Sequence, residues 1–289
     1  MITSVLGISR AKRFSPNSEG RDAAIFSAVA KCLRGAYISV ETVDEEDLTP
    51  MGHLSSYDAA FTMARSEECL TILAEAEAEG LPIINSPSAL LRNTRARLTE
   101  IFRQANIPIA PTRDAATITP EERAQLFTGG QRYWLKRGDA CAQTAGDVRF
   151  IATQEDLEAA LADFSARGVA SALLSQHVEG DLVKFYGVEG ALFFHVYYPT
   201  DGPSFSKFGL ERHNGRPVHT PFSRAALNDA ADEAARLSGF TVYGGDAVVR
   251  PDGSFLIIDF NDWPSFSRCR DDAAEAIAGQ LVWIGDRKI

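Results

Sequence analysis

The sequence of 289 residues lacks an excess of basic residues, paired cysteines and long apolar runs. Its formal net charge is −10, which argues against a nucleic-acid partner, because such proteins cluster Lys and Arg along the phosphate backbone. The four cysteines show no C-x-x-C and no paired spacing, so reduced thiols in a cytoplasmic protein are expected rather than disulfides or structural zinc. No stretch approaches the roughly 20 apolar residues that span a bilayer, and the first nine residues read as a buried strand rather than a signal peptide. No membrane partner is expected.

What the sequence does contain is a globular composition, 45% hydrophobic and 24% charged, at a length that suits two ordinary domains or one large one. The first 85 residues alternate strands and helices with brief connections, which predicts an α/β region with a parallel sheet. Ligands lie beyond the carboxyl ends of such strands. Two loops are therefore candidates, 10–18 and 64–67. The expected strands are 5–9, 37–43, 59–63 and 82–85, and the expected helices are 20–33 and 67–79.

The pattern changes at Asn85-Ser86-Pro87-Ser88, where two serines can cap a helix and Pro87 suits its first turn. A helical stretch is expected to Gln104, then mixed strands and helices. We predict three segments: 1–85, 86–175 and 176–289. The later elements are expected as helices 120–127, 154–167, 224–237 and 271–282, and as strands 133–136, 148–152, 172–177, 182–188, 191–198 and 244–261, the last bent by a turn.

Residues 244–261 predict a hairpin with two carboxylates on one face. A two-residue loop would pair Pro251 with Ser254, and a four-residue loop would pair Arg250 with Phe255. Both give one register, which sets Asp246 opposite Asp259, with Asn261 on the same face opposite Gly244.

Like charges directly opposite each other destabilise a sheet, and a buried unpaired carboxylate is costly. A divalent cation removes this conflict, and two carboxylates with an amide oxygen are ligands that magnesium takes beside substrate phosphates. The alternative is that one Asp faces solvent or pairs with Arg268 or Arg270. From spacing alone both interpretations stay open.

On the basis of this hairpin, the chain from about residue 82 to the end resembles the ATP-grasp superfamily, in its glutathione-synthetase-like and glutamate-ligase-like forms. The resemblance implies an α/β (α+β) fold, in which a parallel-sheet pre-ATP-grasp domain precedes a two-lobed ATP-grasp fold. It also implies ATP and Mg²⁺ as cofactors. Asp246, Asp259 and Asn261 match the acidic residue and the acidic-x-Asn motif that hold two magnesium ions on the ATP phosphates.

Further nucleotide-binding residues are implied by the same resemblance. Arg97 and Lys136 match two phosphate-binding positions, and Lys184 matches a basic residue facing the transferred phosphoryl group. Residues 174–179 resemble the hinge that holds adenine. There the side chain of Gln176 and the backbone of His177 and Val178 would pair with the base, and Glu179 or Asp181 would bind the ribose. Loop 137–146 lacks the family's Gly-rich run, which leaves its role as an ATP lid open.

Most members of the superfamily are carboxylate–amine ligases, in which ATP phosphorylates a carboxylate and an amine displaces the phosphate. Such chemistry needs positioning and charge neutralisation rather than a nucleophilic residue. The many Arg and Lys residues among the candidate substrate residues of this net acidic protein point to a small anionic substrate. Dimers are common for this fold, so a homodimer is a further expectation. The candidate catalytic residues are Lys184 and Arg268, and the candidate substrate residues are Arg10, Ser15, Asn17, Ser18, Arg65, Lys207, Arg212 and Arg268.

Two other functions stay open. Residues 178–190 and 258–261 also resemble inositol polyphosphate kinases of the same fold, which transfer phosphate to a hydroxyl. A nucleotide-binding regulator without turnover is the other alternative, favoured by the Gly-poor loop. The first 85 residues resemble a complete pre-grasp domain, which favours the ligase.

Overall fold

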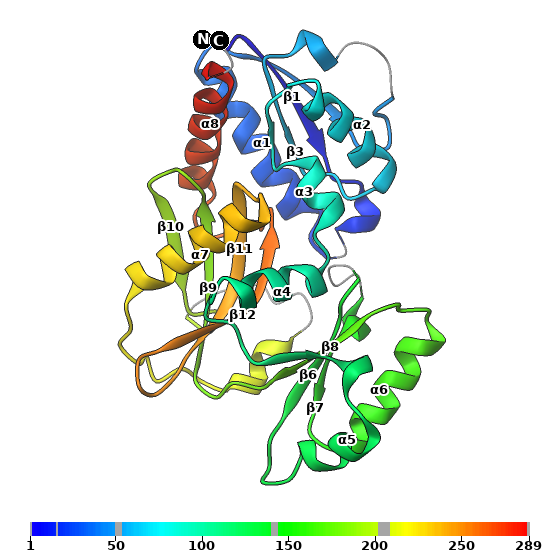
Figure 1. Ribbon diagram of the computed structural model, residues 1–289. Helices are drawn as coiled ribbons and strands as arrows, with labels where there is room; N and C mark the ends of the chain where they lie inside the picture. The colour runs from blue at the N-terminus through cyan, green and yellow to red at the C-terminus, as the bar shows by residue number, and fades with distance from the viewer. Residues whose placement is uncertain (1, 16, 50–53, 140–143, 202–208, 288–289) are drawn as a thin grey trace.

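The computed structural model describes residues 2–15, 17–49, 54–139, 144–201 and 209–287. Its first sheet is parallel, with strand order β2-β1-β3-β4, and helices α1 and α2 pack against it (Figure 1). The predicted parallel sheet is confirmed. Its elements are β1 (Ser4–Ser9), α1 (Glu19–Gly35), β2 (Ser39–Asp44), β3 (Ala59–Thr62), α2 (Glu67–Ala78) and β4 (Ile83–Ile84), with the 3-10 turns η1 (Lys12–Phe14) and η2 (Leu54–Ser56).

The single helical stretch expected up to Gln104 is wrong, because two helices stand there: α3 (Pro87–Arg92) and α4 (Arg95–Gln104). Each has its own N-cap. Ser86 accepts from the backbone amide of Ala89, and Thr94 accepts from that of Arg97 at 3.2 Å. A capping side chain satisfies an amide that the first helical turn leaves without a partner. The break at Asn93 therefore makes Arg95 the first residue of α4.

A second sheet is antiparallel, with strand order β5-β8-β6-β7. Helix α6 packs on it through Leu157, Ala160 and Phe164, which join a core with Leu135 and Leu174. All of its helices and strands were predicted except β5. They are β5 (Thr112–Asp114), α5 (Pro120–Leu126), β6 (Tyr133–Arg137), β7 (Val148–Ile151), α6 (Gln154–Ala166) and β8 (Ala172–Gln176), with the 3-10 turns η3 (Ala115–Thr117) and η4 (Ala145–Asp147).

The third sheet is antiparallel, with strand order β10-β9-β11-β12. Helix α7 packs beside it, whereas α8 lies against α1 and β3 of the first sheet (Figure 1). The elements are β9 (Asp181–Val188), β10 (Phe193–Tyr197), the 3-10 turn η5 (Leu210–Asn214), α7 (Arg224–Ser238), β11 (Val242–Val249), β12 (Phe255–Asp262) and α8 (Arg270–Asp286).

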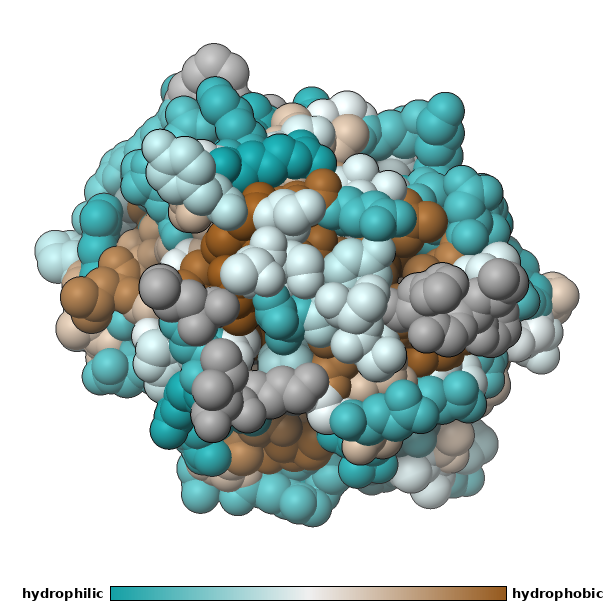
Figure 2. Space-filling model, turned by 90° about the horizontal axis from the view of Figure 1, so that it is seen from above, coloured by the Kyte–Doolittle hydropathy of each residue, from teal (hydrophilic) through white to brown (hydrophobic). Residues whose placement is uncertain are grey.

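The three sheets follow the three predicted segments, except that β8 reaches Gln176 and α8 returns to the first sheet. The domain boundaries themselves stay predictions. Figure 2 views the molecule from the end that carries the first sheet, and apolar residues show there between hydrophilic ones. Within the described ranges, no helix combines the length and apolarity that crossing a membrane requires. Cys32, Cys69 and Cys269 are free thiols, and Cys141 lies outside the described residues.

Candidate active site

The predicted register of the acidic hairpin is confirmed: Asp246 pairs with Asp259, and Gly244 pairs with Asn261. The predicted turn pairing is wrong, because Phe255 pairs with Val249 rather than with Arg250. A β-bulge at Ile258 adds one residue to β12 and shifts the register back. The turn shifts the strand register by one residue, and the bulge cancels that shift, so Asp246 and Asp259 still pair directly.

On the other side of Asp246 stands a lysine. Lys184 of β9 pairs directly with Asp246 of β11, and its Nζ lies 3.0 Å and 3.2 Å from the two carboxylate oxygens. The Nζ atom is also 3.4 Å from Oε1 of Glu211 in η5. Lys184, Asp246 and Asp259 therefore form one row of charges across three neighbouring strands.

Asp259 has cationic neighbours of its own. Its Oδ1 lies 3.3 Å from Nη2 of Arg95, and its Oδ2 accepts from Nδ2 of Asn261 at 2.7 Å. Nζ of Lys136 donates at 2.5 Å to the carbonyl of the bulged Ile258. The alternative interpretation, in which one Asp pairs with an arginine, is thus seen for Asp259, whose partner is Arg95.

Burial and charge act together on these groups. Burial raises the pKa of the Asp246 carboxyl against the effect of Lys184, and Asp259 raises it further. Burial would also raise the pKa of Asp259, but Arg95 and Lys136 outweigh it and hold that pKa below its usual range. Burial lowers the pKa of Lys136 to about 8. For Lys184, Asp246 and Glu211 outweigh burial and keep the pKa above its usual range.

The donors of this row fit magnesium in part. Asp246, Asp259 and Asn261 supply the oxygen atoms that Mg²⁺ prefers, and the crowding of two half-buried carboxylates is what a divalent cation relieves. Among the described residues, no group of three His, Cys, Asp or Glu side chains could hold a metal by itself. The set is therefore suited to a cation that takes its remaining ligands from phosphates and water.

The row faces a cavity of about 730 Å³, within the usual range of small-molecule sites. The cavity lies between the second and third sheets and extends to the loops of the first. We call the part lined by Lys136, Lys184, Asp246 and Asp259 the strand end. The part lined by Arg10, Ser15, Ser18 and Arg65 is the loop end. Apolar residues also line the cavity beside the strand end: Trp134, Val148, Leu182, Leu210 and Ile258.

At the loop end, each arginine is held by a buried carboxylate. Nη1 of Arg10 lies 3.0 Å from Asp22, which also accepts from Oγ of Ser15 at 2.7 Å. Nη2 of Arg65 lies 2.6 Å from Asp262, the residue after Asn261. The loop end thus carries cations held in fixed positions directly beside the strand end.

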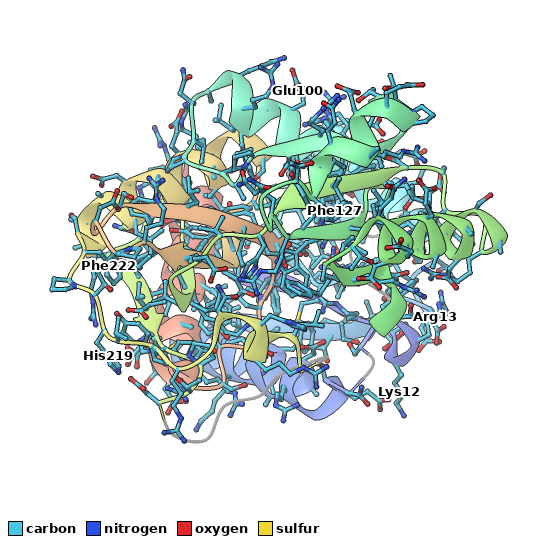
Figure 3. All side chains as sticks on the ribbon, turned by 90° about the horizontal axis from the view of Figure 1, so that it is seen from below. Lys12, Arg13, Glu100, Phe127, His219 and Phe222 are labelled. Carbon is cyan, nitrogen blue, oxygen red and sulfur yellow. The ribbon has the colours of Figure 1, made fainter. Side chains whose placement is uncertain are left out.

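The predicted phosphate-binding Arg97 is exposed and does not line the cavity, whereas Arg95 does. Glu100, one turn further along α4 on the side of Arg97, points outward (Figure 3). The predicted Lys136 and Lys184 both line the cavity. The sequence pattern does not single out Arg95, because it predicts one continuous helix where Thr94 caps a new one.

The predicted adenine hinge lies at the edge of the site. Gln176 lines a separate cavity with Leu174. The amide of His177 donates to the carbonyl of Arg132 at 2.8 Å, and the carbonyl of Val178 accepts from Nδ2 of Asn214 at 3.0 Å. Their roles toward adenine stay predictions.

The two predicted ribose-binding carboxylates are already engaged within the protein. Glu179 is exposed and pairs with Arg132. Asp181 is buried and accepts from the amides of Val218 and Thr220, both at 2.7 Å. Neither lines the cavity of the strand end.

An aromatic cluster that the sequence interpretation missed adjoins this hinge. Nε1 of Trp134 donates to Nδ1 of His177 at 3.0 Å, and the His213 ring stacks on Phe150 with 4.1 Å between centroids. Burial lowers the pKa of His177 to about 4. The imidazole is therefore neutral near pH 7, and the apolar side of the cavity rests against an uncharged cluster.

The other predicted substrate residues are dispersed. Asn17 and Arg212 are exposed and do not line the cavity. The guanidinium of Arg268 lies over the ring of Tyr197, 4.4 Å from its centroid. Lys207 and part of loop 137–146 lie outside the described residues.

Comparison with solved structures confirms the fold class: the chain has the ATP-grasp fold. It resembles D-alanyl-alanine synthetase A from Vibrio cholerae with a TM-score of 0.69 at 13% identity, covering 99% of this chain and 98% of that one. For the ATP-grasp ligase PsnB with its minimal precursor, the TM-score is 0.66 at 16% identity, covering 98% and 99%.

A RimK domain ATP-grasp protein from Sphaerobacter thermophilus matches with a TM-score of 0.65 at 18% identity, covering 97% of this chain and 99% of that one. No protein-family model and no curated protein sequence matches the chain.

Proposed function

We propose that the protein is a Mg-ATP-dependent carboxylate–amine ligase that acts on small anionic metabolites through an acyl phosphate. The observation that carries the proposal is the row Lys184, Asp246 and Asp259 at the strand end, with Asn261 one pairing position further on. Structures of similar fold include D-alanyl-alanine synthetase A. They also include PsnB in a complex with a precursor variant, Mg and ADP. ATP and Mg²⁺ are the cofactors we assign.

The nucleotide is proposed to lie across the strand end. Its base would occupy the apolar side next to Leu182 and Ile258, and its phosphates would meet Lys136, Lys184 and Arg95. Asp246, Asp259 and Asn261 would hold magnesium, which would supply charge neutralisation at the phosphates.

The carboxylate substrate is proposed to lie at the loop end, oriented by Arg10 and Arg65. One carboxylate oxygen attacks the γ-phosphorus, and the bond to the ADP oxygen breaks, giving an acyl phosphate and ADP. The amine nitrogen then attacks the acyl carbon, inorganic phosphate leaves, and the amine loses a proton. Lys184 faces the phosphoryl group in both steps and offsets its charge.

The test combines purified protein, Mg-ATP and pools of carboxylates, with ADP release measured with and without added amines. Amine-dependent ADP release together with an amide product identified by mass supports the ligase. A phosphorylated alcohol would establish a kinase instead. ATP binding without turnover on any pool would point to a regulator. A cytoplasmic location and a homodimer stay predictions.

A further inference from the structure

Glu45, the residue directly after β2, has a buried carboxylate that joins two loops of the first domain. Its Oε1 accepts from the amide of Ala11 at 2.6 Å, and its Oε2 accepts from the amides of Arg65 and Ser66 at 2.8 Å and 2.7 Å. The residue is 3% exposed. Ala11 lies in the loop after β1, and the other two lie in the loop after β3, just before α2. Three backbone donors thus converge on one side chain.

These loops carry the cations of the loop end. Arg10 directly precedes Ala11, and Arg65 is itself one of the donors to Glu45, while both arginines line the cavity. Arg10 also reaches across, donating from Nε to the carbonyl of Met63 at 3.0 Å. The backbone at each arginine is therefore fixed relative to the other through Glu45.

We propose that Glu45 is a positioning residue, whose carboxylate sets the separation of Arg10 and Arg65 for the anionic substrate without touching substrate or nucleotide. This inference rests on the proposed ligase function. Two cations on separate loops can orient one carboxylate only if their separation is held, and a misplacement of about 1 Å can cost roughly 100-fold in rate.

The chemistry of the side chain explains why a carboxylate is needed. A carboxylate is an acceptor on both oxygens and can serve both loops at once. Glutamine has the same shape but only one acceptor oxygen, and its NH₂ group would face backbone donors on the other side. Glu45→Gln therefore releases one loop while it keeps the other.

The electrostatic expectation has the opposite sign, which makes the test decisive. Removing a negative charge near Arg10 and Arg65 would strengthen anion binding if Glu45 acted only through its charge. Loss of positioning weakens it. Asp47→Asn, an exposed acidic residue two positions along, is the matched control for the lost charge.

The experiment uses the full chain with Mg-ATP and a fixed panel of carboxylates: D-alanine, L-alanine, L-glutamate and succinate. In Glu45→Gln we expect the KM for the accepted carboxylate to rise about tenfold, with the dissociation constant of Mg-ATP changed less than about twofold. Amide hydrogen exchange in peptides covering 9–15 and 63–68 should speed up in this variant and not in Asp47→Asn.

An unchanged or lower carboxylate KM in folded Glu45→Gln would overturn the inference. So would unchanged exchange in both peptides. Should the glutamine variant fail to fold, Glu45→Asp keeps both oxygens on a shorter side chain and is expected to show the same KM effect at smaller size. If the wild-type protein turns over no carboxylate of the panel, the exchange rates in the two peptides decide by themselves whether Glu45 holds the loops.

Discussion

At the strand end of the cavity, Lys184, Asp246 and Asp259 stand on three neighbouring strands, whereas at the loop end Arg10 and Arg65 stand on two separate loops. Strand pairing alone sets the spacing of the first group. The second group depends on the buried carboxylates of Asp22, Asp262 and Glu45. Sheet-borne charge is therefore fixed by backbone hydrogen bonds, and loop-borne charge by carboxylate side chains that bind the loops.

The largest effect is expected from the row at the strand end. In Asp259→Asn, turnover of Mg-ATP should fall roughly 10²- to 10³-fold, because a charge that stabilises the transferring phosphoryl group through magnesium is lost. Steady-state ADP release measures it. Asp252→Asn, in the exposed turn of the same hairpin, should leave the rate unchanged. A wild-type rate in Asp259→Asn would contradict the assignment of Asp259 as a magnesium ligand.

Two variants on α4 test which arginine binds the nucleotide at the strand end. Arg95→Gln should weaken Mg-ATP binding roughly 10- to 100-fold, since a hydrogen bond from a charged group is typically worth about 1.5–3 kcal/mol. Arg97→Gln, two residues along on the exposed side, should change affinity less than about twofold. Isothermal titration calorimetry compares the two. Equal losses would restore the phosphate role predicted for Arg97.

At the loop end, Arg65→Lys keeps the charge but loses the planar fork of the guanidinium. We expect the KM for the carboxylate to rise about tenfold, with the affinity for Mg-ATP unchanged. Lysine is preferred over an apolar replacement because Asp262 is buried and would be left without its cation. If the affinity for Mg-ATP fell instead, the loop end would contribute to nucleotide binding, and the assignment of separate ligands to the two ends would be wrong.

The smallest effect concerns stability and pH. His177 has a folded pKa of about 4 against an ordinary 6.5, so between these values the unfolded chain binds a proton that the folded chain does not. Stability from this group is full above pH 6.5 and is lost as pH falls toward 4. His177→Gln, which retains an acceptor for Trp134, should reduce the loss of unfolding free energy between pH 7 and pH 5.5 by roughly 1 kcal/mol. Urea unfolding at the two pH values checks this.

Much of the fold could be predicted because strand and helix periodicities are local. The pairing of Asp246 with Asp259 was predicted correctly although the turn was not, since the bulge at Ile258 cancels the one-residue error. The opposition of Lys184 to Asp246 was not predicted, because register between β9 and β11, which are far apart in the chain, has no local signal.

The parts of the site that escaped prediction depend on contacts between distant segments. Arg95 lies at the cavity because Thr94 caps a new helix that begins at this arginine. Glu45 has no motif at all, since its importance lies in three backbone donors from two other loops. A carboxylate that binds main chain cannot be told from a surface carboxylate by residue type.

Helix α8 packs its apolar face onto α1 and the first sheet, where Ile277 and Leu281 join one core with Ile25 and Phe61. During synthesis, residues 1–85 therefore leave the ribosome with one face of their core uncovered until residues 270–286 follow. Asp262, which pairs with Arg65, also emerges only after most of the chain has been synthesised. Chaperone binding to nascent residues 1–85, and its release when α8 docks, is the expected consequence in the cell.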